Sequence, residues 1–466
     1  MKTAKLVLIS GWTVAAGLAQ AETGTPVNVI YILADDLGYG DLGCYGQQLI
    51  QTPHLDRMAS EGMRFTQHYA GTSVSAPSRA ALMTGLHTGH THIRGNYEIS
   101  PEGQAPLKEG SFTIGHLMQK AGYTTGLFGK WGLGYPGSGS EPNDMGFDEF
   151  YGYVCQRQAH DAYPEFLRRN TTKEFIRGNE NKGRQVYSQH LLQREALHFI
   201  RNNARNPFFA MLTFTVPHAE LNLPHDSIYR LYAGRFDEKP FEYRGGYAAS
   251  EQPKASYAAM VTQLDAYVGE MLAELKKLGI AENTLVIFTS DNGSHREGGH
   301  QPEFFKSSGP LRGVKRALYE GGMRVPTLAW MPGTVPSGST SDHISAFWDM
   351  MPTLADLTGQ KLPVATDGIS MLPALKGSKK QKQHAYLYWE FHEDGGRQAV
   401  RAGDWKAVRE RIASGNPTFE LYNLKDDPGE TTNLTGKYPG RAKKLQKMMD
   451  SARTGSELFN FGKKPE

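Results

Sequence analysis

The chain has 466 residues, with 51 Lys and Arg against 48 Asp and Glu, 39% hydrophobic residues and 2 cysteines. This length suggests two or three domains with a large buried core, which excludes a small disulfide-stabilised scaffold. The hydrophobic content excludes a disordered chain, and a formal net charge of +3 without basic runs interleaved with aromatic residues argues against nucleic acid binding.

The first segment is typical of a secretory signal peptide. Two lysines precede the mostly apolar run from Leu6 to Ala19, and Ala19-Gln20-Ala21 has the small-x-small pattern of a cleavage site. A buried N-terminal helix is the alternative. We predict a signal peptide over 1–21 and a periplasmic or secreted protein without stable membrane insertion, because no other apolar stretch is long enough to span a bilayer. In such a compartment Cys44 and Cys155 could pair or remain free.

Apolar segments then alternate with helical patterns. The run from Val27 to Leu33 ends in Asp35-Asp36, as expected for a strand buried on both faces of a parallel sheet. The alternation predicts an α/β fold, a mostly parallel central sheet flanked by helices. Further predicted strands are Thr125–Phe128, Phe208–Val216, Leu285–Thr289 and Thr327–Trp330. Predicted helices are Leu55–Glu61, Ser78–Met83, Ile114–Lys120, Tyr187–Asn202, Tyr257–Lys277 and Ala346–Leu357.

The pattern changes after Gly359. Three alternating segments, Ala385–Phe391, Gln398–Val408 and Phe419–Leu424, precede a charged amphipathic helix near Ala442–Ala452. We expect a small antiparallel sheet with one helix. The sequence therefore predicts a main domain over 22–359 and a smaller C-terminal α+β subdomain over 360–466.

Acidic residues follow two of the predicted strands. Asp35-Asp36 follows the first strand, and Asp291-Asn292 follows the strand at Leu285–Thr289. Ligands of open α/β sheets bind at the carboxyl ends of the strands, and three carboxylates there would repel one another unless a cation joined them. Oxygen donors favour Ca²⁺, with Mg²⁺ as the second choice, over Zn²⁺. The alternative is that a single aspartate only caps a helix.

A serine lies in the most distinctive stretch, from Ser75 to Gly85. Pro77 restricts the backbone and Ser78 can cap the following helix, so Ser75 should lie just ahead of a helix N-terminus that favours an anion. The stretch is not a nucleophile elbow, because the second glycine of G-x-S-x-G is missing. The residues alone predict an anion-binding turn that contains a hydroxyl.

This stretch, Ser75-Ala-Pro-Ser-Arg-Ala-Ala-Leu-Met-Thr-Gly85, resembles the signature of the type I sulfatases, the formylglycine-dependent branch of the alkaline phosphatase-like superfamily. The resemblance includes bacterial carbohydrate sulfatases and covers nearly the whole mature chain, so it implies an alkaline phosphatase-like fold with 22–359 as the catalytic domain. Matching segments in the family's order are Ala34–Gly38, Gly129–Trp131, Thr289–Gly293, Gly313–Lys315, Tyr319–Gly322 and Met351–Leu354.

The resemblance implies that Ser75 is oxidised to formylglycine by a serine-type maturase. A hydrated aldehyde beside a divalent cation is a better nucleophile than a serine hydroxyl. One hydroxyl of the hydrate would attack sulfur in line, and the hydrate would then expel sulfate. The implied metal ligands are Asp35, Asp36, Asp291 and Asn292, with the modified Ser75.

The same resemblance implies roles for four further residues. Arg79 would hold the hydroxyls of the hydrate, Lys130 and Lys315 would contact the sulfate oxygens, and His218 would protonate the leaving alcohol. One position departs from the family pattern, which has histidine where this chain has Gly132. His295 and His300 could replace that imidazole, or they could be surface or substrate-facing loop residues.

The predicted function is removal of sulfate from a carbohydrate, a galacto-configured glycan fragment. Arylsulfatase activity on small aromatic sulfates is the near alternative; a phosphatase or phosphodiesterase of the same superfamily and a non-catalytic binder of sulfated glycans are the others. A polar cluster between aromatic-rich stretches, Gln156 to His160, suits contacts to sugar hydroxyls. The predicted substrate-binding residues are Arg157, His160, His295 and Glu297.

Overall fold

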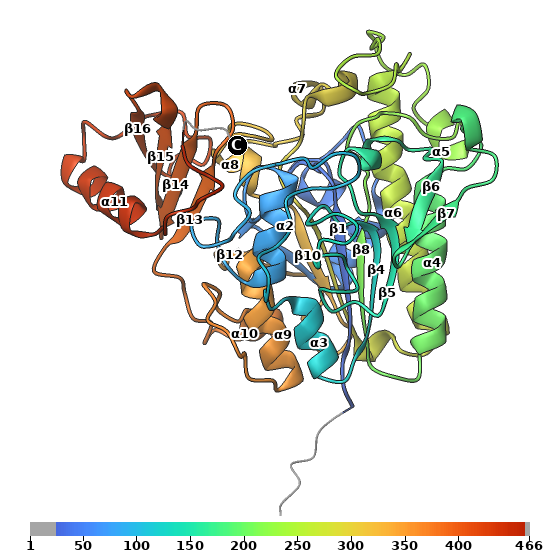
Figure 1. Ribbon diagram of the computed structural model, residues 1–466. Helices are drawn as coiled ribbons and strands as arrows, with labels where there is room; N and C mark the ends of the chain where they lie inside the picture. The colour runs from blue at the N-terminus through green and yellow to red at the C-terminus, as the bar shows by residue number, and fades with distance from the viewer. Residues whose placement is uncertain (1–24, 462–466) are drawn as a thin grey trace, which may run out of the picture.

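The structure is a computed structural model that describes residues 25–461. The predicted signal peptide over 1–21 lies outside the described residues. At the centre is a ten-stranded sheet in the order β11-β2-β10-β9-β1-β8-β4-β5-β6-β7, with helices on both faces (Figure 1). All five strands predicted for the main domain are present: β1 (Asn28–Ala34), β4 (Thr124–Lys130), β8 (Phe208–Thr213), β9 (Thr284–Ser290) and β10 (Thr327–Trp330).

Five neighbouring strands, β9-β1-β8-β4-β5, pair in parallel, which confirms the predicted mostly parallel α/β sheet. β10 pairs antiparallel with β9. Every residue of β1, β8 and β9 is buried, because helices cover both faces. The remaining strands of this sheet were not predicted, because they are too short to show an alternating pattern. They are β2 (Met63–Phe65), β5 (Glu149–Tyr153), β6 (Phe166–Arg169), β7 (Thr172–Phe175) and β11 (Ser339–Ser341).

Successive side chains of β1 enter two different cores. Ile30 and Ile32 pack in the core formed with α1 (Pro53–Glu61), α4 (Ser188–Asn203) and α6 (Pro253–Lys277). Tyr31 and Leu33 pack in the core formed with α2 (Ser75–Thr84), α3 (Ile114–Lys120) and α9 (Met350–Thr358). Figure 1 shows α4 and α6 on one side of the sheet and α2, α3 and α9 on the other. The sheet is therefore the middle layer of three.

Helix α2 begins earlier than the sequence suggested. Ser75 is its first residue, and Val74 is the N-cap residue. Ser78 is therefore inside the first turn and does not cap the helix. Its hydroxyl donates to the carbonyl of Asp291 at 2.5 Å and accepts the Gly71 N–H at 3.0 Å. The hydroxyl of Ser78 fastens the helix to the end of β9.

The C-terminal part forms the expected small antiparallel sheet, with α11 (Pro439–Ser451) on one face. The segment predicted as one strand over 398–408 is two strands, because the Gly403-Asp404 turn between them is too short to interrupt the pattern. The strands are β13 (Leu387–Phe391), β14 (Arg397–Ala402), β15 (Trp405–Glu410) and β16 (Thr418–Asn423). The opposite face packs on the main domain, where the Trp389 ring lies 5.1 Å from that of Tyr69.

A buried ionic group also joins the two parts. The ammonium of Lys406 on β15 lies 2.9 Å from carboxylate oxygens of both Glu320 and Glu430. All three side chains are buried, and Glu320 begins α8 (Glu320–Met323), which follows Lys315 in the chain. The small sheet thus helps to fix a segment next to the strand ends of the large sheet.

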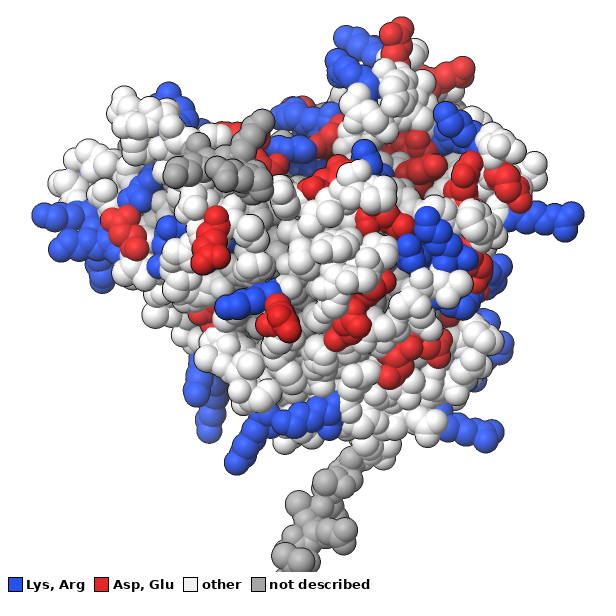
Figure 2. All heavy atoms as spheres, in the orientation of Figure 1, with Lys and Arg blue, Asp and Glu red and all other residues white. Residues whose placement is uncertain are grey.

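The surface charges, the cysteines and the helices add three facts. Acidic and basic side chains are interspersed on the face shown in Figure 2, which fits the balanced composition. Cys44 and Cys155 are both free thiols. Among residues 25–461, every helix is too short or too polar to cross a bilayer.

Candidate active site

The carboxyl ends of β1 and β9 bring the predicted acidic residues together. The two strands pair in register from Asn28 to Ala34, so the residues that follow them emerge side by side. The Asp36 N–H donates to Oδ1 of Asp291 at 3.1 Å, and the side-chain amide of Asn292 donates to Oδ1 of Asp36 at 2.6 Å. All these side chains are buried, and Asp36 has a left-handed φ of 65°. The strand register therefore creates a compact cluster of oxygen donors.

Helix α2 places two residues against this cluster. The hydroxyl of Ser75 donates to Oδ1 of Asp35 at 3.2 Å. Arg79 lies one turn later, and its Nη2 is 2.8 Å from Oδ2 of Asp291, while its Nη1 donates to the carbonyl of Lys130 at 2.9 Å. Residues four apart share one face of a helix, so this spacing directs both side chains to the strand ends.

Two buried lysines face the carboxylates. The Nζ atom of Lys130 lies 2.7 Å from Oδ2 of Asp35 and 3.3 Å from the hydroxyl of Ser75. Burial lowers the pKa of Lys130. The Nζ atom of Lys315 lies 2.7 Å from Oδ2 of Asp36; burial lowers its pKa, but Asp36 and then Glu297 outweigh this effect and raise it. Lys315 is therefore a cation in the site.

The imidazole of His218 lies beside Lys315. Its Nε2 is 3.0 Å from Nζ of Lys315, and its Nδ1 is 2.5 Å from the carbonyl oxygen of Ala219. The charged ammonium donates, so Nε2 accepts and the ring proton lies on Nδ1. Burial, followed by the charge of Lys315, lowers the pKa of His218 well below its ordinary value. The ring is consequently neutral, with its Nε2 lone pair directed into the site.

A cavity of about 590 Å³ opens above Ser75. Of the predicted substrate-binding residues, Arg157 and His160 line it, and the His160 ring stacks on His218 with the centroids 4.8 Å apart. His295 and Glu297 are not among the lining residues. The residues that line the cavity are Ser75, Asn96, Glu98, Gln104, Gln156, Arg157, His160, His218, Tyr243, Gly245, Gly246, Tyr247, Lys315 and Arg316.

His295 and Glu297 contact residues of the site without lining the cavity. His295 is fully buried, and its Nε2 lies 3.0 Å from the Pro217 carbonyl. The Glu297 carboxylate lies 3.6 Å from Nζ of Lys315 and 2.5 Å from the guanidinium of Arg316. His300 is also buried and stacks on Tyr257 at 3.5 Å. Neither histidine is a surface residue.

Amide side chains surround the place where the family pattern has histidine. Gly132 has a φ of +76°, and a Cβ atom there would lie 2.9 Å from Cγ of Gln156. The amide of Gln156 donates to Oδ1 of Asn96 at 3.4 Å, and that oxygen also accepts the Ala76 N–H at 3.2 Å. Gln156 and Asn96 thus occupy the space beside Ser75. The polar cluster from 156 to 160 indicated that Gln156 could lie in the site, but no sequence feature indicated this for Asn96.

The donor set fits a hard divalent cation. The Oδ1 atom of Asn292 is buried and has no hydrogen-bond partner within residues 25–461, although an amide oxygen normally accepts. Burial raises the pKa of Asp291, so the carboxylates gain from a nearby cation. Carboxylate and amide oxygens suit Ca²⁺ or Mg²⁺. The three carboxylates are balanced by Arg79, Lys130 and Lys315, so a bound dication would leave the site positive toward an anion.

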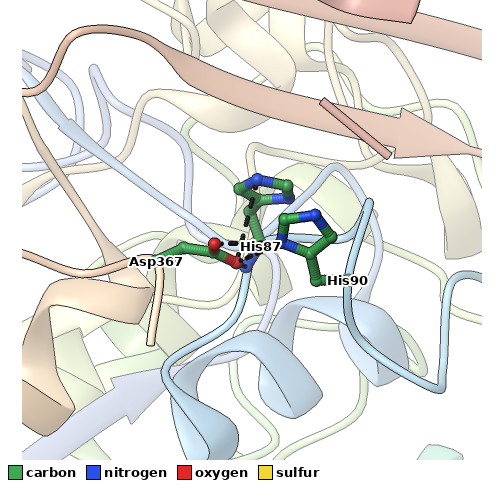
Figure 3. A group of neighbouring side chains, drawn as sticks. All are labelled: His87, His90 and Asp367. Atoms are coloured by element: carbon green, nitrogen blue, oxygen red, sulfur yellow. Dashed lines mark hydrogen bonds and ion pairs between the residues drawn. The ribbon is translucent and has the colours of Figure 1, made fainter. Parts of the chain in front are cut away.

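A second group with ligating atoms lies at the end of α2: His87, His90 and Asp367 (Figure 3). The His90 Nδ1 lies 2.9 Å from Oδ1 of Asp367, and the backbone N–H of His87 donates to Oδ2 at 3.0 Å. The Nδ1 atom of His87 accepts the Gly89 N–H at 3.1 Å, so its ring proton lies on Nε2, the atom a metal would need. We interpret this group as a hydrogen-bond cluster that joins α2 to the segment after α9.

Comparisons with known proteins point to one family. A family model described as "Sulfatase" matches residues 27–360, and one described as "N-sulphoglucosamine sulphohydrolase, C-terminal" matches residues 314–454. The chain is 34% identical over 461 residues to arylsulfatase A of Homo sapiens, covering 91% of this chain and 86% of that protein. It is 33% identical over 410 residues to N-acetylgalactosamine-6-sulfatase of Canis lupus familiaris, covering 83% and 74%. The crystal structure of Ps i-CgsB in complex with k-i-k-neocarrahexaose superposes with a TM-score of 0.79 and 28% identity, covering 93% of this chain and 95% of that one.

Proposed function

The chain belongs to the sulfatase family and is a sulfuric ester hydrolase of the alkaline phosphatase-like superfamily, and we propose that it removes sulfate from a carbohydrate, a galacto-configured glycan fragment. The observation that carries the proposal is the position of Ser75, between Asp35 and Lys130 at the base of a cavity lined by amides. Relatives named N-acetylgalactosamine-6-sulfatase and a neighbour bound to a neocarrahexaose support a sugar substrate.

Ser75 is the proposed nucleophilic position after oxidation to formylglycine by a serine-type maturase. As the aldehyde hydrate, the side chain would supply a hydroxyl that attacks sulfur. The proposed metal is Ca²⁺, with Mg²⁺ as the alternative, and it would supply charge that stabilises this hydroxyl. Its proposed ligands are Asp35, Asp36, Asp291 and Asn292, together with the modified Ser75.

The surrounding cations bind and orient the reacting group. Arg79 lies one helical turn from Ser75, and we assign it to hold the hydrate hydroxyls. The ammonium groups of Lys130 and Lys315 are assigned to the sulfate oxygens, where they meet the negative charge that develops during transfer. Both lysines are buried, so their charges are weakly screened by water.

His218 is assigned to protonate the leaving alcohol. The resting ring is neutral, and its Nε2 accepts a hydrogen bond from Lys315. A bound sulfate ester adds negative charge beside the ring, which favours the protonated form. Glu297 positions Lys315, and through Lys315 it also orients the imidazole.

The proposed domain division follows from these assignments. Residues 22–359 would carry the chemistry, and residues 360–466 would form the C-terminal subdomain that holds the Lys315 segment. The predicted signal peptide assigns the protein to the periplasm or the medium. A second candidate function, hydrolysis of small aromatic sulfates, is favoured by the 34% identity to arylsulfatase A.

The test combines mass spectrometry with a substrate panel. Protein is produced in its native host or with a serine-type maturase, and the Ser75 peptide should show the mass loss of two hydrogen atoms. The matured enzyme is then assayed on sulfated mono- and disaccharides, an aryl sulfate and an aryl phosphate. Faster hydrolysis of a sulfated saccharide is expected; hydrolysis of the aryl sulfate alone would replace the proposal with the second candidate, and unmodified Ser75 without turnover would indicate a binding protein.

A further inference from the structure

A short hairpin over residues 241–250 forms one wall of the cavity. Phe241 and Ser250 exchange two backbone hydrogen bonds at 2.8 and 2.9 Å, and Arg244 and Tyr247 exchange two at 3.2 and 3.3 Å. The two glycines between Arg244 and Tyr247 have φ values of +66° and +86°, as a type I′ turn requires. The hairpin therefore has a defined backbone that presents its side chains to the cavity.

The hairpin carries two tyrosines in different settings. Tyr247 is held by histidines of the site, with ring centroids 5.1 Å from His160 and 6.0 Å from His218. Tyr243 also lines the cavity but is 72% exposed, and no aromatic ring within residues 25–461 packs against it. One tyrosine is thus part of the site's internal packing, whereas the other presents a free face at the mouth.

The other walls of the cavity have a different chemistry. Asn96, Gln104 and Gln156 supply amides, and Arg157 forms a 2.8 Å ion pair with Glu98 near the opening. Amides and such pairs hydrogen-bond hydroxyl groups, whereas an aromatic face binds the apolar face of a sugar ring. The cavity therefore changes from a cationic base, through polar walls, to an aromatic mouth.

We propose that Tyr243 is a binding platform for the sugar linked to the sulfated residue, and that it contacts the apolar face of that second pyranose ring. The inference rests on the proposed carbohydrate sulfatase function and narrows its substrate to sulfated oligosaccharides. A cavity of about 590 Å³ lies within the range that encloses ligands larger than one small ring. Tyrosine provides a broad contact face with few rotatable bonds, so little conformational entropy is lost on binding.

The test compares a monosaccharide and a disaccharide that carry the same sulfate ester at the non-reducing end. In Tyr243→Ala the ratio of kcat/KM for the disaccharide to that for the monosaccharide should fall about five- to tenfold, mainly through KM. Tyr243→Phe should keep the wild-type ratio, because it retains the ring. Phe175→Ala is the matched control: Phe175 is also an exposed aromatic residue, at 66%, but lies on the edge strand β7.

Two results overturn the inference while the proposed function stands. One is a wild-type enzyme that hydrolyses both saccharides, with the same ratio in Tyr243→Ala. The other is an equal loss in Tyr243→Phe, which would assign the effect to the hydroxyl. Hydrolysis of an aryl sulfate with neither saccharide cleaved at any enzyme concentration would instead remove the proposed function and the inference together. Thermal unfolding of each variant shows whether it has folded.

Discussion

Lys315 donates a hydrogen bond to the neutral imidazole of His218, with 3.0 Å between Nζ and Nε2. The same ammonium lies 2.7 Å from Asp36, so one cation joins a proposed metal ligand to the proposed proton donor. Replacing Lys315 should therefore disturb charge stabilisation and proton transfer at once.

We expect Lys315→Ala to lower kcat/KM by about 10²- to 10³-fold on any sulfate ester that the matured enzyme hydrolyses, because one buried charge facing the transition state is lost. Steady-state kinetics measures the effect. Lys276→Ala, which removes a half-exposed lysine paired with Glu61, is the control and should keep wild-type kinetics. Unchanged kcat/KM in a folded Lys315→Ala protein would contradict the assignment.

Metal binding should stabilise the folded chain. After chelation, adding Ca²⁺ should raise the thermal unfolding midpoint, since a ligand at about 100 times its Kd adds about 2.7 kcal/mol. Asn292→Ala removes the side-chain oxygen that has no hydrogen-bond partner in the described part of the chain, and it should shift the Ca²⁺ titration at least about tenfold toward higher concentration. Asn202→Ala, at an exposed amide on α4 that hydrogen-bonds the imidazole of His198, should titrate like wild type. A midpoint insensitive to both Ca²⁺ and Mg²⁺ would argue against a cation at this cluster.

A substitution at Gly132 tests whether Gln156 fills the space where a side chain at position 132 would lie. We expect Gly132→Ala to lower the free energy of unfolding by about 1–3 kcal/mol, because φ is +76° and the new Cβ would meet Gln156. Gly122→Ala has a similar φ of +84° but open space around the Cβ, so it reports backbone strain alone. Urea unfolding should show a larger loss for Gly132→Ala, and adding Gln156→Ala should recover the difference. Equal losses at the two glycines would show that Gln156 does not fill this space.

The buried carboxyl of Glu390 should make the free energy of unfolding depend on pH. Burial raises its pKa, but hydrogen bonds from His392 and Arg453 and the charge of Arg94 outweigh burial and hold the pKa to about 2, below the ordinary 4.5. A carboxyl with a lowered folded-state pKa stabilises the protein above about pH 4.5, and this stabilisation is lost as the pH falls toward 2.

Glu390→Gln should therefore lower the free energy of unfolding by about 3–5 kcal/mol at pH 7, because buried cations lose their partner. The difference from wild type should shrink when urea unfolding is repeated near pH 3.5. Glu303→Gln breaks an exposed pair with Arg296 and should change stability by less than about 1 kcal/mol. A Glu390→Gln effect that is the same at both pH values would contradict the lowered pKa.

The sequence predicted the parts of the site that depend on strand ends. The apolar runs of β1 and β9 are long, and parallel neighbours end at one edge, so Asp35 and Asp291 were expected to meet. Cavity walls made by loops were not predictable in this way. Asn96, for example, is positioned by a hydrogen bond from its backbone N–H to the carboxylate of Glu393, almost three hundred residues away. The Gly245-Gly246 pair is a sequence signal for a hairpin that was not among the predicted elements, and the position of this hairpin in the cavity wall depends on tertiary packing.

Two element boundaries were predicted wrongly, the division between β14 and β15 and the start of α2. The turn between β14 and β15 has only two residues, so hydrophobic alternation continued through it. Ser78 was expected to cap a helix because serine often does so. Its hydroxyl instead donates to the carbonyl of Asp291, the residue that follows β9, and α2 begins three residues earlier at Ser75.

The buried position of Lys406 has a consequence for biosynthesis. Glu320 and Glu430 share this one ammonium, and all three side chains are inaccessible to water. While the polypeptide is being synthesised, Glu320 has Arg324 at 3.5 Å but lacks the buried ammonium of Lys406 until β15 has emerged, so the segment that carries Lys315 can adopt its final form only late. A premature stop codon between Lys315 and β15 is therefore expected to yield a product that proteases degrade, even though the proposed nucleophile and metal ligands have all been translated.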